Sequence, residues 1–170
     1  MTALALWLAL SSPIPDYYGV PGVAMSYDPV LNHWADANLV PRPLARRLVA
    51  AESGFKPDGQ AYQWQERRGK WHKTTKVLAN GVAMVTTNER HLAEHLARAG
   101  IDAADYDWRD ASDSLRVGMA YLGYLLRYFD YEHRPAVAGY NAGRDRASAW
   151  WNDGRALPRE TVGYLRKVLR

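Results

Sequence analysis

Apolar residues recur every three or four positions between residues 111 and 129, and this is the clearest helical pattern in the chain. They form one face of a helix: Leu115, Met119, Leu122, Leu126 and Phe129. Gly118 and Gly123 fall in the same stretch, and a glycine lets a neighbouring helix approach closely because it has no side chain. The pattern therefore predicts a buried central helix, around which the rest of the chain has to pack.

A shorter helix is predicted over residues 43–52. Leu44, Leu48 and Glu52 follow one another at four-residue intervals, so Glu52 lies on or beside the buried stripe of this helix. Gly54 predicts the end of the helix immediately afterwards. The carboxylate is therefore expected near a helix end that opens on a cleft.

The remaining helices are predicted from their start and stop residues. The first begins at the capping-box pair Thr86 and Glu89 and ends at Gly100, and the second begins at Pro135 and ends at Asn141 and Gly143. The third covers about residues 145–152. The last begins at Pro158, and its inward residues are Val162, Leu165, Val168 and Leu169.

Two segments do not follow the helical period. Residues 58–85 are expected to form a small flap, best interpreted as a short hairpin with its turn near Gly69. Residues 1–30 include a stretch rich in Pro, Gly and Ser, and are expected to form an N-terminal arm packed on the domain. Residues 31–170 then form a single, mainly α domain of the α+β type.

The net charge of the chain indicates which kinds of polymer it can bind. The chain has 170 residues, no Cys, a formal net charge of +4 and a pI of about 9.4, so its surface should attract anionic polymers such as a cell wall, a nucleic acid or a membrane. We expect no nucleic-acid partner, because no nucleic-acid-binding motif is present. The apolar stretch over residues 3–10 is too short to span a bilayer and has no basic residue before it, so a packed helix is favoured over a secretory signal and no stable membrane insertion is expected.

Three short motifs carry the most functional information. They are Glu52-Ser53-Gly54-Phe55, then Gly139-Tyr140-Asn141-Ala142-Gly143, then Leu157-Pro158-Arg159-Glu160-Thr161 with Tyr164. In this order they resemble the signature of the lytic transglycosylase domain of the lysozyme-like superfamily, which cleaves the glycan strands of bacterial peptidoglycan. The resemblance covers most of the chain and implies a lysozyme-like fold and a peptidoglycan partner. We expect a monomer that needs no cofactor.

The resemblance also assigns the catalytic residues. It implies that Glu52 is the single general acid and base, and that the hydroxyl of Tyr140 faces it across the groove. Glu52 would protonate the bond between N-acetylmuramic acid and N-acetylglucosamine and then accept the C6 hydroxyl proton, which leaves a 1,6-anhydromuramyl end. An acid of this kind needs an apolar setting that favours its neutral form, and Leu48, Val49 and Phe55 are the candidates to supply it.

Further residues are expected to contact substrate: Ser53, Phe55, Met84, Asn141, Glu160, Tyr164, Trp64 and Trp71. Met84 stands where the family usually has a Gln. Structural alternatives remain open for several of them, because Ser53 and Asn141 can bond backbone at a helix end and Glu160 lies in the favoured first turn of a helix. The two tryptophans can stack on sugars while nearby basic residues meet anionic wall groups, or they can pad a solvated basic loop.

Two other functions stay open at this point. One is a hydrolysing muramidase of the same fold, in which an Asp such as Asp58 helps water to attack, and the other is a non-catalytic wall-binding or virion structural protein. His91 and His95 are spaced like metal ligands, but no third ligand is evident, so we expect an exposed pair and no metal. Action in the bacterial periplasm or cell wall is expected, with delivery by a phage particle or a secretion apparatus.

Overall fold

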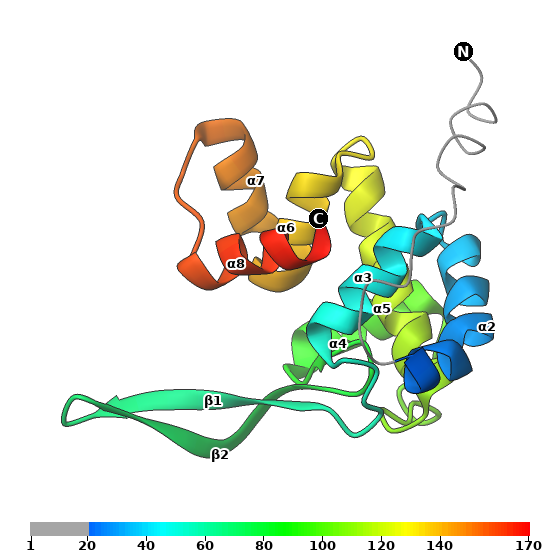
Figure 1. Ribbon diagram of the computed structural model, residues 1–170, viewed down its shortest axis with the longest axis horizontal. Helices are drawn as coiled ribbons and strands as arrows, with labels where there is room; N and C mark the ends of the chain where they lie inside the picture. The colour runs from blue at the N-terminus through cyan, green and yellow to red at the C-terminus, as the bar shows by residue number, and fades with distance from the viewer. Residues whose placement is uncertain (1–20) are drawn as a thin grey trace.

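The computed structural model describes residues 21–170 and is built mainly of α-helices, with one small antiparallel sheet (Figure 1). The helices are α2 (Pro21–Ala37), α3 (Arg42–Glu52), α4 (Glu89–Ala99), α5 (Ala111–Tyr128), α6 (His133–Ala142), α7 (Arg144–Asp153) and α8 (Arg159–Val168). The sheet contains β1 (Gln60–Arg67), β2 (Lys70–Asn80) and β3 (Val85–Thr86). Within this part of the chain, no helix combines the length and the apolar character that crossing a membrane requires.

Helix α5 is the buried centre of the domain, as its sequence predicts. It packs against α2, α4 and α6, and Leu115, Met119 and Leu122 on its inner face are fully buried. Its two glycines mark close approaches: a Cβ on Gly118 would lie 2.5 Å from the Ala83 side chain, and one on Gly123 would lie 2.5 Å from the backbone oxygen of Asn38, the residue after α2. The prediction of a central helix with glycine contacts is confirmed.

Helix α2 corrects the predicted N-terminal arm. Regular structure begins at Pro21 rather than after residue 30, and the helix continues through Pro29. Pro21 fits the first helical position, where a backbone N–H is not needed. Leu31 and Ala35, which follow Pro29, are buried against the core, and Asp28, just before it, forms an ion pair with Arg46 of α3. The part of the predicted arm before Pro21 lies outside the described residues.

Helix α3 ends where the sequence predicts. It begins at Arg42, one residue before the predicted start, and its last residue is Glu52. Gly54 follows with a φ of +61°, a conformation that favours glycine and turns the chain away from the helix axis. The carboxylate is therefore carried at the C-terminal end of α3.

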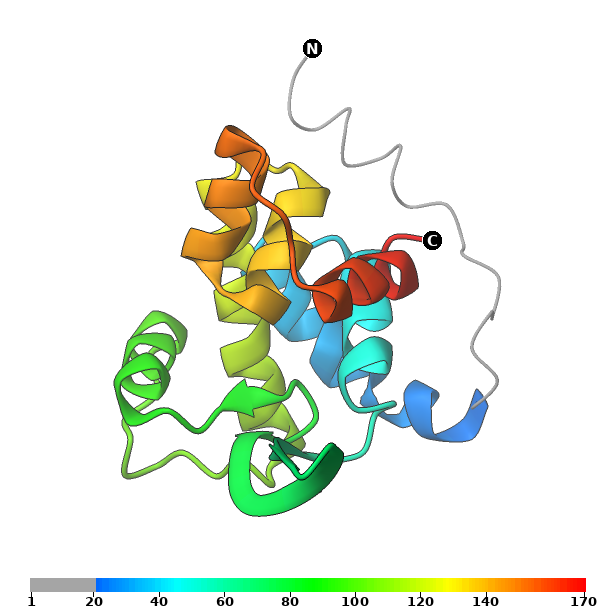
Figure 2. The same ribbon diagram turned by 90° about the vertical axis from the view of Figure 1, so that its left-hand side faces the viewer.

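The predicted hairpin is confirmed. Strands β1 and β2 pair antiparallel from Gln60 opposite Asn80 to Arg67 opposite Lys70, with Arg68 and Gly69 at the turn. The short strand β3 adds to the other edge of β2. Figures 1 and 2 both show the hairpin below α6 and α7, and Figure 1 shows it projecting outward from the helices.

Helix α4 is predicted correctly at its end and incorrectly at its start. Gly100 caps it in the left-handed conformation, with a φ of +65°. The N-cap, however, is Asn88, whose side chain accepts a hydrogen bond from the backbone of His91 at 3.3 Å. The predicted capping box of Thr86 with Glu89 is wrong because Thr86 is the last residue of β3.

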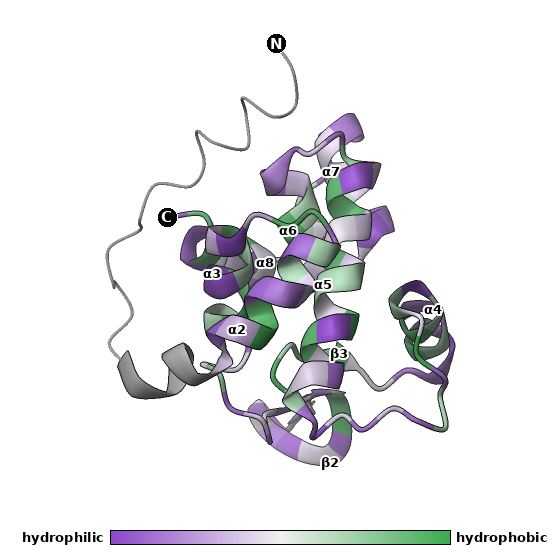
Figure 3. Cartoon of the chain, turned by 90° about the vertical axis from the view of Figure 1, so that its right-hand side faces the viewer, coloured by the Kyte–Doolittle hydropathy of each residue, from purple (hydrophilic) through white to green (hydrophobic). Residues whose placement is uncertain are grey.

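The last three helices follow the predicted order, and α8 closes the site. It packs against α3 and α6, which brings the C-terminal motif beside Glu52. Thr161, Tyr164 and Val168 face inward, whereas Val162 is 37% exposed, so its predicted inward position is wrong. Both α4 and α7 carry hydrophilic and hydrophobic segments, as expected of helices with one face in water (Figure 3).

Candidate active site

Glu52 lies at the edge of a cavity of about 320 Å³, here called the acid cavity. Its walls come from α3, the sheet, α4, α5, α6 and α8, and its lining residues are Glu52, Ala61, Leu78, Ala79, Met84, Val85, Thr86, His95, Val117, Gly118, Tyr121, Tyr140, Asn141 and Glu160. All three sequence motifs therefore meet at one place. The hydroxyl of Tyr164, a residue of α8 that does not line the cavity, donates a hydrogen bond to Glu52 Oε1 at 2.5 Å.

Burial raises the pKa of Glu52 to about 7, from an ordinary value of 4.5. The apolar surroundings expected from the sequence are present, because Leu48 and Val49 are fully buried and Phe55 is 4% exposed. The hydrogen bond from Tyr164 lowers this pKa, and the negative charge of Glu160 raises it. The balance leaves a carboxyl group that exists in both protonation states near neutral pH, as a group that first donates and then accepts a proton requires.

The loop of residues 81–84 contributes Met84 to the lining of the acid cavity, and four hydrogen bonds hold it. Gly81 N–H donates to the Gly59 backbone at 3.0 Å, and Ala83 N–H donates to the buried hydroxyl of Ser114 at 3.1 Å. Ser53 donates to the Val82 carbonyl at 2.7 Å, and Tyr140 donates to the Ala83 carbonyl at 2.8 Å. Side chains from α5 and α6, together with Ser53 just after α3, thus fix one loop.

Tyr140 lines the same cavity as Glu52, but its hydroxyl proton is used elsewhere. The hydroxyl donates to the Ala83 carbonyl and makes no hydrogen bond to Glu52. Burial raises the pKa of the Tyr140 phenol well above 10, and the negative charge of Glu52 raises it further, so the group stays neutral. Tyr164, rather than Tyr140, is the tyrosine that hydrogen-bonds the acid.

Some of the other predicted contact residues line the acid cavity, and others do not. Met84 and Glu160 line the acid cavity, and so does Asn141, whose Oδ1 accepts a hydrogen bond from Thr161 at 2.8 Å. Phe55 is packed in the core beside the ring of Tyr27, with ring centroids 6.3 Å apart.

Trp64 and Trp71 lie on the hairpin rather than on the helices. Trp64 is on β1 opposite Lys73, and Trp71 is on β2 opposite Glu66. Their side chains are outside the described part of the structure. Asp58, the candidate base of a hydrolase, is exposed and is not among the residues that line the acid cavity.

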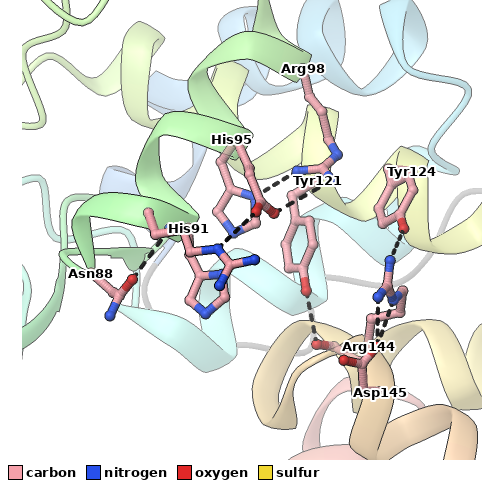
Figure 4. A network of polar contacts seen from close by, with 11 residues as sticks. Asn88, His91, His95, Arg98, Tyr121, Tyr124, Arg144 and Asp145 are labelled. Carbon is pink, nitrogen blue, oxygen red and sulfur yellow. Dashed lines mark hydrogen bonds and ion pairs between the residues drawn. The ribbon is translucent and has the colours of Figure 1, made fainter.

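A second cavity of about 690 Å³ continues from the acid cavity toward α7. The two share Thr86, His95, Tyr121, Tyr140 and Asn141, so they adjoin and are together called the groove. Three arginines line the far part: Arg98, Arg144 and Arg146. Figure 4 shows Arg144 between Tyr124 and Asp145, and it donates to both, at 2.8 Å from the Tyr124 hydroxyl and 2.8 Å from Asp145 Oδ1.

His95 is a groove residue that the sequence interpretation missed. Its ring centroid lies 4.1 Å from that of Tyr121, and burial, followed by the positive charge of Arg98, lowers its pKa to about 4 (Figure 4). His91 is exposed as expected, but His95 is half-buried. The missed signal was the helical period, since His95 shares the inner face of α4 with Leu92 and Leu96. Among residues 21–170, no three His, Cys, Asp or Glu side chains cluster as metal ligands would.

Comparisons with known proteins agree with this architecture. The model of the Transglycosylase SLT domain family matches residues 29–162, more than three quarters of the chain. A search of curated proteins found no match. Among solved structures, an inactive mutant of the lytic transglycosylase Slt from Pseudomonas aeruginosa is similar, with 22% sequence identity and a TM-score of 0.68.

The structural match covers 85% of this chain and 23% of that Slt chain, and at this identity it speaks for the fold alone. It confirms the mainly α, lysozyme-like fold class predicted from the sequence. The family match confirms the resemblance carried by the three motifs. From these findings, the chain belongs to the Transglycosylase SLT domain family.

Proposed function

We propose that this chain is a peptidoglycan lytic transglycosylase domain that cleaves the β-1,4 bond between N-acetylmuramic acid and N-acetylglucosamine. The observation that carries the proposal is the state of Glu52. Burial raises its pKa to about 7, its carboxyl accepts a hydrogen bond from Tyr164, and it lines a cavity that adjoins a second, larger one. Family membership supports the same activity, since the family is that of transglycosylase domains.

The first step is proton transfer from Glu52 to the glycosidic oxygen. The bond between that oxygen and C1 of the muramyl sugar breaks, its electron pair stays on the oxygen, and the N-acetylglucosamine part leaves as an alcohol. Positive charge develops on the muramyl ring, and the newly formed Glu52 carboxylate lies beside it. The Tyr164 hydroxyl stabilises this carboxylate because it hydrogen-bonds the charged form.

In the second step, the Glu52 carboxylate accepts the proton of the muramyl C6 hydroxyl while that oxygen bonds to C1. The product is a 1,6-anhydromuramyl end, no water is consumed, and Glu52 returns to its neutral form. A pKa near 7 suits this sequence, because neither protonation state is strongly disfavoured. Positioned acid–base catalysis contributes about 10²–10⁴-fold, so the groove has to supply further acceleration by binding and distorting the sugar.

The walls of the groove supply the substrate contacts in this proposal. Asn141, Met84 and Glu160 line the acid cavity, and the arginines of the second cavity suit the anionic groups that peptidoglycan carries. Tyr140 and Ser53 act by holding the 81–84 loop in place. The chain works as a monomer on the bacterial cell wall or in the periplasm, brought there by a phage particle or a secretion apparatus.

A hydrolase remains the second candidate, and one observation favours it. Glu160 also lines the acid cavity, so a second carboxylate is available near Glu52 to activate water. The products separate the two reactions. Mass spectrometry of digested peptidoglycan should show anhydromuramyl ends, and reducing muramyl ends in their place would assign the chain as a hydrolase.

The role of Glu52 is tested with a matched pair of variants. Glu52→Gln should lower product release at least about 100-fold, because an amide cannot donate the proton. Glu132→Gln should keep the parent activity, since Glu132 is exposed, lies outside the groove and makes no side-chain cap. Equal wall clearing by Glu52→Gln and the parent would remove Glu52 from the mechanism and favour a non-catalytic role.

A further inference from the structure

The net positive charge of the chain is concentrated in the hairpin. Residues 60–80 contain five basic residues and one acidic residue, which gives a net charge of +4. The other 149 residues contain 17 basic and 17 acidic residues and are formally neutral. The high pI therefore comes from one structural element, and any attraction to a polyanion should be strongest there.

The hairpin presents this charge to solvent, away from the helices. Strand β1 packs chiefly against β2, and the paired segment extends about 23 Å at the usual rise per residue. Arg68, Lys70, Lys73 and Lys76 are exposed, and among the ion pairs of the described residues none includes them. Lys73 is ordered over the ring of Tyr62, with Nζ 3.5 Å from the ring centroid, and this leaves the charge on the surface.

The root of the same hairpin is part of the acid cavity. Ala61 of β1 and Leu78 and Ala79 of β2 line it together with Glu52. The charged strands therefore begin at the place where a glycan strand would be cut and run outward from it.

Resting on the proposed function, we infer that the hairpin is a docking arm for the carboxylates of the peptide stems of peptidoglycan. The base of the hairpin favours this partner because it lines the acid cavity. When a glycan strand occupies that cavity, the polyanion nearest to the exposed lysines is the surrounding peptidoglycan. Flexible ammonium groups match carboxylates whose spacing varies, since they need no fixed two-point geometry. The arm holds the enzyme on the wall by several weak, salt-sensitive contacts while the groove releases and captures strands.

The test measures binding without cleavage. In the Glu52→Gln chain, the substitutions Arg68→Gln, Lys70→Gln and Lys76→Gln remove three exposed charges and leave Lys73 on Tyr62. Binding to insoluble peptidoglycan stripped of phosphate polymers should weaken about tenfold at low salt, as three exposed charge contacts would predict. The control carries Arg134→Gln, Arg155→Gln and Arg166→Gln, which remove the same charge from exposed sites on or beside α6–α8, and its binding should change less than twofold.

Three results would overturn the inference. Equal weakening by both sets of substitutions would mean that only total charge matters, and no weakening by either would mean that the hairpin charges serve solubility. A difference that appears only on walls that keep their phosphate polymers, or on nucleic acid or anionic vesicles used as probes, would assign another partner. With peptidoglycan whose carboxylates have been converted to amides, the difference between hairpin and control variants should disappear.

This outcome is separable from that of the proposed function. Binding is measured in a chain that cannot act as an acid, whereas anhydromuramyl ends are measured with the parent chain. Loss of products with a retained hairpin effect would reject the reaction alone. Equal melting temperatures of the two triple variants would show that both are folded, so that a difference in binding does not come from unfolding.

Discussion

The Tyr164 hydroxyl donates a hydrogen bond to Glu52 Oε1 across 112 positions of sequence. Burial disfavours the charged form of Glu52, and this bond favours it, so the two effects act on the same pKa in opposite directions. Tyr164 is itself buried, at 7% exposure. Burial raises the pKa of its phenol far above 10, and the negative charge of Glu52 raises it further. The hydroxyl therefore remains a donor at any pH at which the protein works.

Tyr164→Phe should raise the pKa of Glu52 above 7, because the substitution removes a bond to the charged form. The alkaline limb of the kcat/KM profile should move to higher pH. The maximal rate should fall roughly tenfold, since the acid is no longer oriented. The exposed Tyr131→Phe serves as the control and should change neither property. A profile for Tyr164→Phe that keeps its limb near pH 7 would contradict this role.

Glu160→Gln should have the opposite effect on the profile. The negative charge of Glu160 raises the pKa of Glu52, so its removal should lower that pKa and move the alkaline limb to lower pH. The shift should shrink as salt is added, because Glu160 is exposed and its charge is screened. If Glu160 instead activates water, turnover should collapse at every pH.

Glu52 should also make the stability of the fold depend on pH. Its folded pKa of about 7 lies above the ordinary value of 4.5, so the unfolded chain loses its proton first as pH rises. Stability relative to Glu52→Gln is fully present below about pH 4.5 and is lost as pH rises through 7, by about 3 kcal/mol in all. Urea unfolding of both proteins at a series of pH values measures this difference, and a constant difference would refute it.

Gly118→Ala should damage both the fold and the site. The added Cβ would lie 2.5 Å from the Ala83 side chain and 2.9 Å from the Tyr140 hydroxyl. This hydroxyl donates to the Ala83 carbonyl and so holds the 81–84 loop. We expect a loss of about 1–3 kcal/mol and weaker activity, because overpacking shifts this loop. Gly163→Ala is the matched control: it is also helical, meets no atom within 4 Å, and should be neutral or slightly stabilising. Unfolding midpoints compare the two.

Local signals in the sequence predicted the framework well. The apolar period identified α5, and Gly54 and Gly100 identified the ends of α3 and α4, since these features act within one or two helical turns. The errors arose where two local signals competed. The prolines of the arm predicted irregular chain, but Pro21 begins a helix and packing carries that helix through Pro29.

The contacts of the site could not be predicted in the same way. The sequence nominated Glu52, Tyr140 and Tyr164, but which tyrosine bonds the acid depends on how α8 packs against α3. The anchoring of the 81–84 loop depends likewise on Ser114 and Ser53, whose partners lie 31 and 29 positions away. Such pairings are properties of the packed domain, and no spacing pattern encodes them.

The segment between α7 and α8 has a consequence for regulation by proteolysis. Residues 154–156 are exposed, and they belong to the connection that joins α8, the helix that carries Tyr164, to the rest of the chain. A single cut there would leave α8 attached through its packing against α3 and α6, and loss of α8 would expose Glu52 to water and return its pKa toward 4.5. Loss of α8 after one cut in this connection would thus inactivate the proton donor and leave the central helix and the hairpin uncut.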